Sequence, residues 1–184
     1  NTTGTNNVAA GYMSLGCNTA GGQNTATGKG AGMKNTTANY NTSSGYMALC
    51  GTTSSNYNAA FGSCALAQNI TGSVNTAVGH AALRANTGSS NTGVGMAALL
   101  NSTGAYNTGV GTCVLYDNTT GDNNTSVGRQ SALNNTTGSR NTVLGAQAFY
   151  TNTTGDDNVV VGYHTLKANT TGDHNTAVGS CALC

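Results

Sequence analysis

Small, apolar and polar residues recur along this chain in a regular order, once every sixteen or seventeen positions. The clearest element is an asparagine followed four positions later by a glycine, as in Asn75-Thr76-Ala77-Val78-Gly79. It occurs eleven times, with eight intervals of seventeen positions and two of sixteen between successive asparagines. This regularity predicts a single repeat array over residues 1–184. The anchor asparagines are Asn7, Asn24, Asn41, Asn58, Asn75, Asn91, Asn107, Asn124, Asn141, Asn158 and Asn175.

Each repeat is numbered here from its anchor asparagine, which is position 0. Position 1 is threonine in eight of the eleven repeats, position 2 is small in nine, and position 3 is apolar in nine. Position 8 is leucine or phenylalanine in nine repeats, and the rest of the unit is a polar stretch such as Asn118–Gly121. Alternating threonine and valine suit a pleated strand, whereas glycine, asparagine and threonine favour turns. Each unit is therefore expected to form a strand, a glycine turn, a second short strand and a polar turn.

A unit of this length cannot bury its own apolar face, so the repeats are expected to stack on one another. The predicted fold is all-β: a parallel β-solenoid, or β-roll, of about eleven coils, one for each repeat. Stacking places equivalent residues in columns, and stacked asparagines can bind one another through their amides. The expected structural ladder includes Asn75, Asn91 and Asn107, with Gly79, Gly95 and Gly111 at a fixed corner.

The interior of such a solenoid is expected to be thin. Positions 3 and 8 carry the only large apolar side chains, and we expect them to fill it. Because position 2 faces the opposite side of a pleated strand, small residues such as Ala77 would then lie on an outer face. Another copy of the chain could approach closely there, so the sequence predicts self-association. The alternative is that an exposed position 2 merely tolerates small residues.

Composition narrows the classes of partner. Asparagine, threonine and glycine occupy 84 of 184 positions, only 6% of residues are charged, and the net charge is +1. The six basic residues lie singly along the chain, which argues against a nucleic-acid surface. No apolar run is long enough to cross a bilayer, so no membrane insertion is expected. Because neither end has an atypical capping repeat, we expect the chain to be a segment of a longer fibre.

The Asn-Thr-Ala-Val-Gly anchor resembles the repeats of trimeric autotransporter adhesin heads. It is equally similar to the Asn-Thr-Ala-Val-Gly-x-x-Ala-Leu repeats of phage tail fibres and related bacterial surface fibres. The resemblance covers essentially the whole chain, although this sequence has one residue fewer between Asn and Gly than the adhesin motif, a slightly longer repeat and six cysteines. It implies a left-handed β-roll of three chains. It also implies a stiff, non-enzymatic extracellular fibre module that attaches or presents at a cell surface or on a virion.

Two other functions stay open at this point. The chain stops almost in phase with its start and has no atypical capping repeat, which is compatible with a filament whose copies stack end to end. The threonine column at position 1 suggests an ice-binding solenoid, although we expect those threonines to face inward beside position 3. Exposed tyrosines at position 5 would be the usual contacts for a surface glycan or a host receptor.

No constellation for catalysis, a cofactor or a metal is expected. Cys50 and Cys64 fall on neighbouring coils, at positions 9 and 6, which makes a disulfide between them possible. The cysteines could equally fill the interior as small apolar residues. The single Cys181-x-x-Cys184 motif has no second pair, and the three histidines fall on different columns. The five aspartates lack the repeating pattern of calcium-binding β-rolls.

A row of glycosylation sequons occupies position 11, in what we expect to be the outward turn. In a secreted eukaryotic chain these asparagines would be glycosylation acceptors. Repetition in a chain rich in asparagine and threonine produces the same sequons without that meaning. The six residues are Asn35, Asn69, Asn118, Asn135, Asn152 and Asn169.

Overall fold

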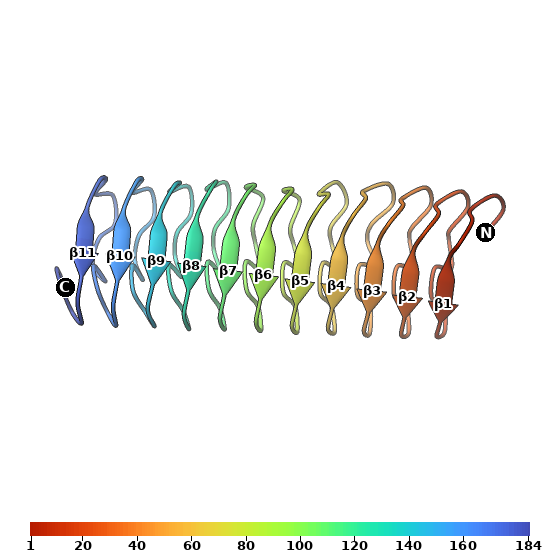
Figure 1. Ribbon diagram of the computed structural model, residues 1–184, viewed down its shortest axis with the longest axis horizontal. Coiled ribbons are helices and arrows are strands. Elements are labelled where there is room, and N and C mark those ends of the chain that lie inside the picture. The colour runs from red at the N-terminus through yellow and green to blue at the C-terminus, as the bar shows by residue number, and fades with distance from the viewer.

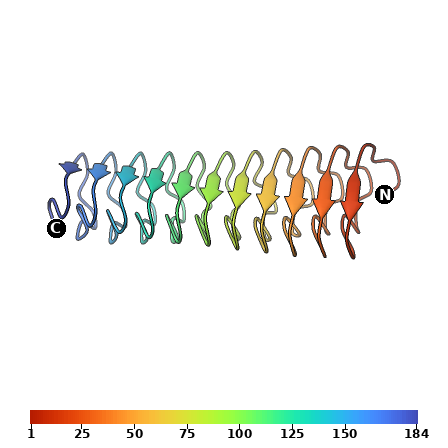
Figure 2. The ribbon, with the colours of Figure 1, turned by 60° about the horizontal axis from the view of Figure 1, so that its bottom comes forward.

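The computed structural model describes residues 1–184 and confirms the predicted parallel β-solenoid. Each repeat contributes one short strand, and the eleven strands lie side by side in chain order in a single sheet (Figure 1). The chain forms a rod with its two termini at opposite ends (Figure 2). It holds no helix long and apolar enough to cross a bilayer. The strands are β1 (Val8–Ala10), β2 (Thr25–Thr27), β3 (Thr42–Ser44), β4 (Ala59–Phe61), β5 (Thr76–Val78), β6 (Thr92–Val94), β7 (Thr108–Val110), β8 (Thr125–Val127), β9 (Thr142–Leu144), β10 (Val159–Val161) and β11 (Thr176–Val178).

Every strand pairs with the next in the same register, so equivalent positions form straight columns along the rod. Thr76 of β5 lies beside Thr92 of β6, and Thr92 lies beside Thr108 of β7. These pairs span the two shorter repeats. The missing residue falls in the polar turn, where Asn86-Thr87-Gly88 has one threonine fewer than Asn118–Gly121. The shortening is therefore absorbed outside the sheet.

The expected second strand is absent, and a turn takes its place. Positions 6 and 8 have positive φ in every coil, as at Cys64 (58°) and Leu66 (50°). A pleated strand requires negative φ throughout, so this segment cannot be one. Its N–H groups still bind the neighbouring coil, as when the Leu66 N–H donates to the Ala82 carbonyl at 3.0 Å. Of 118 backbone hydrogen bonds, 98 lie outside the strands.

In each strand the side chain at position 2 points into the interior. The expectation that position 3 fills the interior is therefore wrong. Ala77 is 0% exposed, whereas the neighbouring Val78 is 39% exposed. Position 8 is buried in most coils, as expected, and it leaves little room opposite the strand. A Cβ added to Gly93, at position 2 of its coil, would lie 3.1 Å from the Leu83 Cγ. Small residues at position 2 therefore fit a narrow interior and do not mark an interface.

The anchor asparagines line the rest of the interior and join each coil to the next. The backbone N–H of Asn91 donates to the Asn75 Oδ1, and that of Asn107 donates to the Asn91 Oδ1, both at 2.9 Å. The Asn91 Nδ2 donates to the Gly104 carbonyl of its own coil at 2.8 Å. One buried amide thus closes its own coil and also binds the following one.

The glycines at position 4 stack without room for a side chain. A Cβ on Gly79, whose φ is +131°, would lie 2.6 Å from the Gly95 carbonyl oxygen. Gly95 and Gly111 repeat this arrangement in the next two coils, with φ of +130° and +138°. Both the backbone conformation and the close approach of successive coils therefore require glycine at this corner.

A matched pair of substitutions tests which side of the strand is buried. Ala77→Arg should abolish folding, because it places an unpaired charge in an interior that leaves no room for it. Val78→Arg, one residue further, should leave the fold intact because its side chain lies outside. Circular dichroism and thermal unfolding of both variants measure the difference, and a folded Ala77→Arg protein would contradict the assignment.

The anchor amide makes a second test. Asn107→Ala removes the acceptor for the Asn124 N–H and the donor to the Gly121 carbonyl. The Asn124 N–H is then left unpaired, whereas the Gly121 carbonyl keeps the hydrogen bond from the Asn118 Nδ2 at 2.9 Å. The free energy of unfolding should therefore fall by about 1–3 kcal/mol. Asn134→Ala, at a half-buried asparagine whose φ is not positive and whose side-chain amide makes no hydrogen bond, is the matched control and should cost much less. Equal losses in chemical denaturation would show that the ladder is not what stabilises the coils.

Candidate functional site

The outer surface of the sheet, which we call the strand face, carries two parallel columns of side chains. Because position 2 points inward, positions 1 and 3 of every strand point outward. Neither column contains a charged residue. Position 1 comprises Val8, Thr25, Thr42, Ala59, Thr76, Thr92, Thr108, Thr125, Thr142, Val159 and Thr176, all exposed or half-buried.

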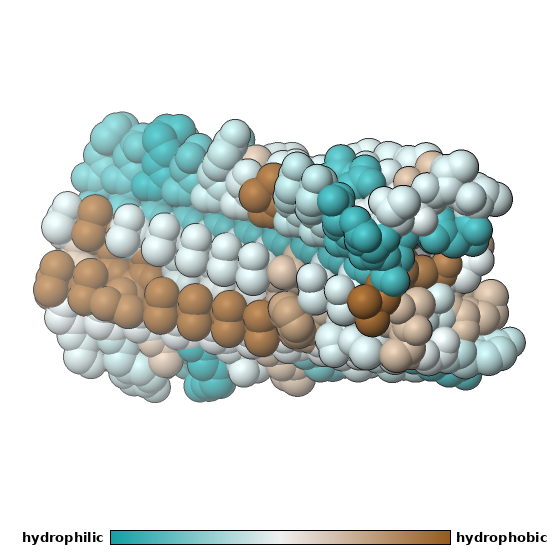
Figure 3. Space-filling model, turned by 45° about the vertical axis from the view of Figure 1, so that its right-hand side comes forward, coloured by the Kyte–Doolittle hydropathy of each residue, from teal (hydrophilic) through white to brown (hydrophobic).

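Position 3 forms an uninterrupted apolar stripe over the strands β4 to β11. Its members are Phe61, Val78, Val94, Val110, Val127, Leu144, Val161 and Val178. Leu144 is 50% exposed and Val178 is 68% exposed, and the other members are exposed or half-buried. Figure 3 shows a continuous band of apolar atoms along the rod, with a row of near-neutral hydropathy beside it. A contiguous exposed apolar surface of this kind marks a site of interaction.

The threonine column is the second feature of the strand face. We expected these threonines to face inward together with position 3, and that expectation is wrong because both positions face outward. Thr76, Thr92, Thr108, Thr125 and Thr142 follow one another without a break over the strands β5 to β9. The face therefore presents methyl and hydroxyl groups at a spacing set by the strands, beside the apolar stripe.

Other exposed columns also stack from coil to coil. The rings of Tyr40 and Tyr57, at the position before the anchor, are parallel with centroids 4.8 Å apart. At position 5 the Lys29 ammonium lies between the rings of Tyr12 and Tyr46, at 5.9 and 6.0 Å from their centroids. These contacts give the N-terminal part of the rod an aromatic surface away from the strand face.

Toward the C-terminus the column before the anchor is ionic. Arg140 donates to the Asp157 carboxylate from Nε at 2.7 Å and from Nη2 at 2.8 Å. This double hydrogen bond lowers the pKa of Asp157 and raises the pKa of Arg140. The His174 Nε2 lies 3.7 Å from the Oδ2 of the same carboxylate. These groups are exposed or half-buried, so the pairing organises the surface more than it stabilises the fold.

A further side-chain ladder, which was not predicted from the sequence, lies two residues before most of the anchors. The Asp156 Oδ1 accepts the Ser139 N–H at 2.7 Å, and the Asp173 Oδ1 accepts the Asp156 N–H at 2.7 Å. Asn39 and Asn56 do the same in earlier coils. The signal was present, because this position is asparagine, serine or aspartate in eight of eleven repeats. These aspartates bind backbone N–H groups, and no group of three or more His, Cys, Asp or Glu side chains is arranged to hold a metal ion.

All six cysteines are free thiols, and only Cys50 is buried. Burial raises the pKa of the Cys50 thiol, and the nearby Cys64 thiol raises it further. The Cys50 Sγ donates to the Ala67 carbonyl at 3.3 Å. Cys50 and Cys64 thus lie close to each other in reduced form, and a disulfide between them stays a prediction. At the other end, desolvation raises the pKa of the Cys184 thiol and Cys181 raises it further.

The row of sequons does not lie on the surface, contrary to our expectation. Asn35 is 2% exposed, Asn69, Asn118, Asn135 and Asn152 are 0% exposed, and Asn169 is half-buried. Their amides are donors inside the solenoid, as when the Asn135 Nδ2 binds the Asn118 Oδ1 at 2.7 Å and the Gly138 carbonyl at 2.8 Å. This column is therefore an internal ladder, like that of the anchor asparagines. A glycan attached to such a nitrogen would have to break these hydrogen bonds.

No family model, curated protein or solved structure matches this chain. The fold and the strand face are therefore the features that bear on function.

Proposed function

We propose that this chain is a structural segment of an extracellular fibre, in which the strand face packs against other copies of the same chain. The observation that carries the proposal is the exposed apolar stripe from Phe61 to Val178. In a lone rod this stripe lies in water, and burying it against a partner removes that apolar area from water. The proposed role is mechanical and not catalytic.

A second copy of the chain suits this surface for a geometric reason. Every rod carries the same columns at the same spacing, so parallel rods around an axis along their length can match their stripes over many coils at once. The uncharged lining of the strand face sets no like charges against each other at such a contact. We propose three chains, as the resemblance to trimeric adhesin heads and tail fibres implies.

The remaining surfaces of the assembly would face the surroundings. Tyr12 is 71% exposed and Tyr163 is 52% exposed, both at position 5. We propose these aromatic side chains as contacts for a surface glycan or a host receptor, on a cell surface or a virion. The competing proposal is a filament of copies stacked end to end with no adhesive role.

Charge placed on the stripe tests the assembly. The double variant Val110→Arg and Leu144→Arg should convert a trimer into monomers, because an interface cannot bury unpaired charges from every chain. Mass from light scattering measures the change, and circular dichroism should show an unchanged fold.

Ile70→Arg is the matched control for this experiment. Ile70 is 55% exposed but lies in the polar turn, away from the strand face, so this variant should keep the mass of the parent protein. A parent protein that is monomeric at micromolar concentration would contradict self-association, and an assembly unaffected by the two arginines would contradict the assigned face. Electron microscopy separates short rods from long end-to-end filaments.

Ice binding is a second candidate, because the threonine column faces outward on an uncharged sheet. If it applies, purified protein should show thermal hysteresis, and Thr108→Tyr together with Thr125→Tyr should abolish it by interrupting the threonine column without touching the interior. Tyr12→Ala, on another face, should leave the hysteresis unchanged. An absence of hysteresis at high protein concentration would reject this function while leaving the fibre proposal standing.

A further inference from the structure

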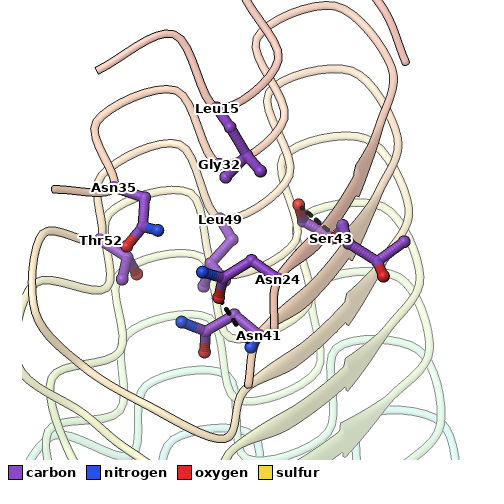
Figure 4. Close-up of a pocket in the computed structure, with 9 residues that line it drawn as sticks. Leu15, Asn24, Gly32, Asn35, Asn41, Ser43, Leu49 and Thr52 are labelled. Atoms are coloured by element: carbon purple, nitrogen blue, oxygen red, sulfur yellow. Dashed lines mark hydrogen bonds between the residues drawn. The ribbon is translucent and has the colours of Figure 1, made fainter. Parts of the chain in front are cut away.

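Two departures from the repeat meet at one point of the interior. Gly32 occupies position 8, where nine repeats have leucine or phenylalanine, and Thr52 occupies position 11, where most repeats have asparagine. Between Leu15 and Leu49 the apolar column is therefore interrupted, and a cavity of about 10 Å³ lies there (Figure 4). The continuous cluster of buried apolar residues begins only beyond it, at Ala48 and Leu49.

The cavity contains an unpaired hydrogen-bond acceptor. In much of the position 11 ladder the Nδ2 of an asparagine donates to the Oδ1 of the preceding coil, as from Asn152 to Asn135 at 2.7 Å, whereas the Asn86 Nδ2 donates to the Gly88 carbonyl. Thr52 has no amide, and its hydroxyl donates to the Asn69 carbonyl at 2.8 Å. The Asn35 Oδ1 is thus left as a buried polar atom without a partner, on a side chain that is 2% exposed. Both residues line the cavity (Figure 4).

The other departure in this ladder has no such consequence. Ser102 also replaces asparagine at position 11, but the Oδ1 of Asn86 in the preceding coil accepts the Asn91 Nδ2 at 3.0 Å. The Ser102 Oγ itself accepts the Asn118 Nδ2 at 3.4 Å. Loss of the amide alone therefore does not orphan an acceptor. The unpaired oxygen coincides with the cavity beside Gly32.

We propose that this cavity is a binding site for one water molecule, which donates a hydrogen bond to the Asn35 Oδ1 in place of the missing amide. A single water requires about 10–15 Å³ and two to four polar partners. The cavity has this size, and Thr52 and Ser43 are among the polar residues that line it. The Ser43 Oγ makes only a long hydrogen bond of 3.4 Å to the Thr25 carbonyl. No charged side chain lines the cavity, which favours a neutral ligand over an ion.

Restoring the amide tests the site. In a high-resolution crystal structure of the parent protein, we expect a water peak within hydrogen-bond distance of the Asn35 Oδ1. Thr52→Asn should remove that peak, because its Nδ2 takes over the bond. It should also raise the melting temperature, by about 2–4 °C if the gain is of the order of one hydrogen bond. Ser102→Asn is the matched control and should give no comparable gain, since no acceptor is unpaired there.

Gly32→Leu is an independent variant that leaves Thr52 untouched. Its backbone is already in the conformation that leucine adopts at this position, with φ of 57° at Gly32 and 52° at Leu49. Filling the cavity should also displace the water. A dry cavity or a metal ion in the parent structure would overturn the proposal. So would a gain in melting temperature for Thr52→Asn no larger than that for Ser102→Asn.

Discussion

Hydrogen bonding between successive coils is the interaction on which the rest of this structure depends. A single coil has almost no core of its own, and most of the backbone hydrogen bonds lie outside the strands. In each coil the backbone is left-handed at three positions: the one before the anchor, position 6 and position 8. Almost all of the residues at these positions are not glycine. Each such residue costs about 1–2 kcal/mol relative to right-handed geometry. Backbone hydrogen bonds between successive coils, together with the asparagine ladders, offset that cost.

Tight stacking also decides what faces water. The interior between the strand and position 8 admits only small side chains at most coils, so the larger apolar residue of each strand turns outward. The apolar stripe is thus a consequence of the narrow interior, and it leaves a single chain with an exposed apolar surface along most of its length. The fibre of several chains that we propose would cover this stripe.

The period of the sequence was sufficient to predict the parallel solenoid and the strand at positions 1 to 3. It was not sufficient to predict which side of that strand is inside. Alternation along the strand places Ala77 and Val78 on opposite faces but does not say which face is buried. We assigned the larger residue to the interior, and that prediction was wrong. The prediction that the asparagines at position 11 lie in an outward turn was wrong for a related reason. Asparagine next to threonine and glycine is typical of exposed turns, and only three-dimensional stacking shows that Asn118 and Asn135 bind each other inside.

The two sixteen-residue repeats show that the solenoid tolerates a change in the length of a coil. The repeats that begin at Asn75 and Asn91 lose one residue in the polar turn, yet the columns on both sides stay aligned. Whole coils can therefore be gained or lost, and single residues trimmed from that turn, without altering the contacts of the coils that stay. Each coil adds one strand spacing, about 4.8 Å. The number of repeats in the sequence therefore sets the length of the rod.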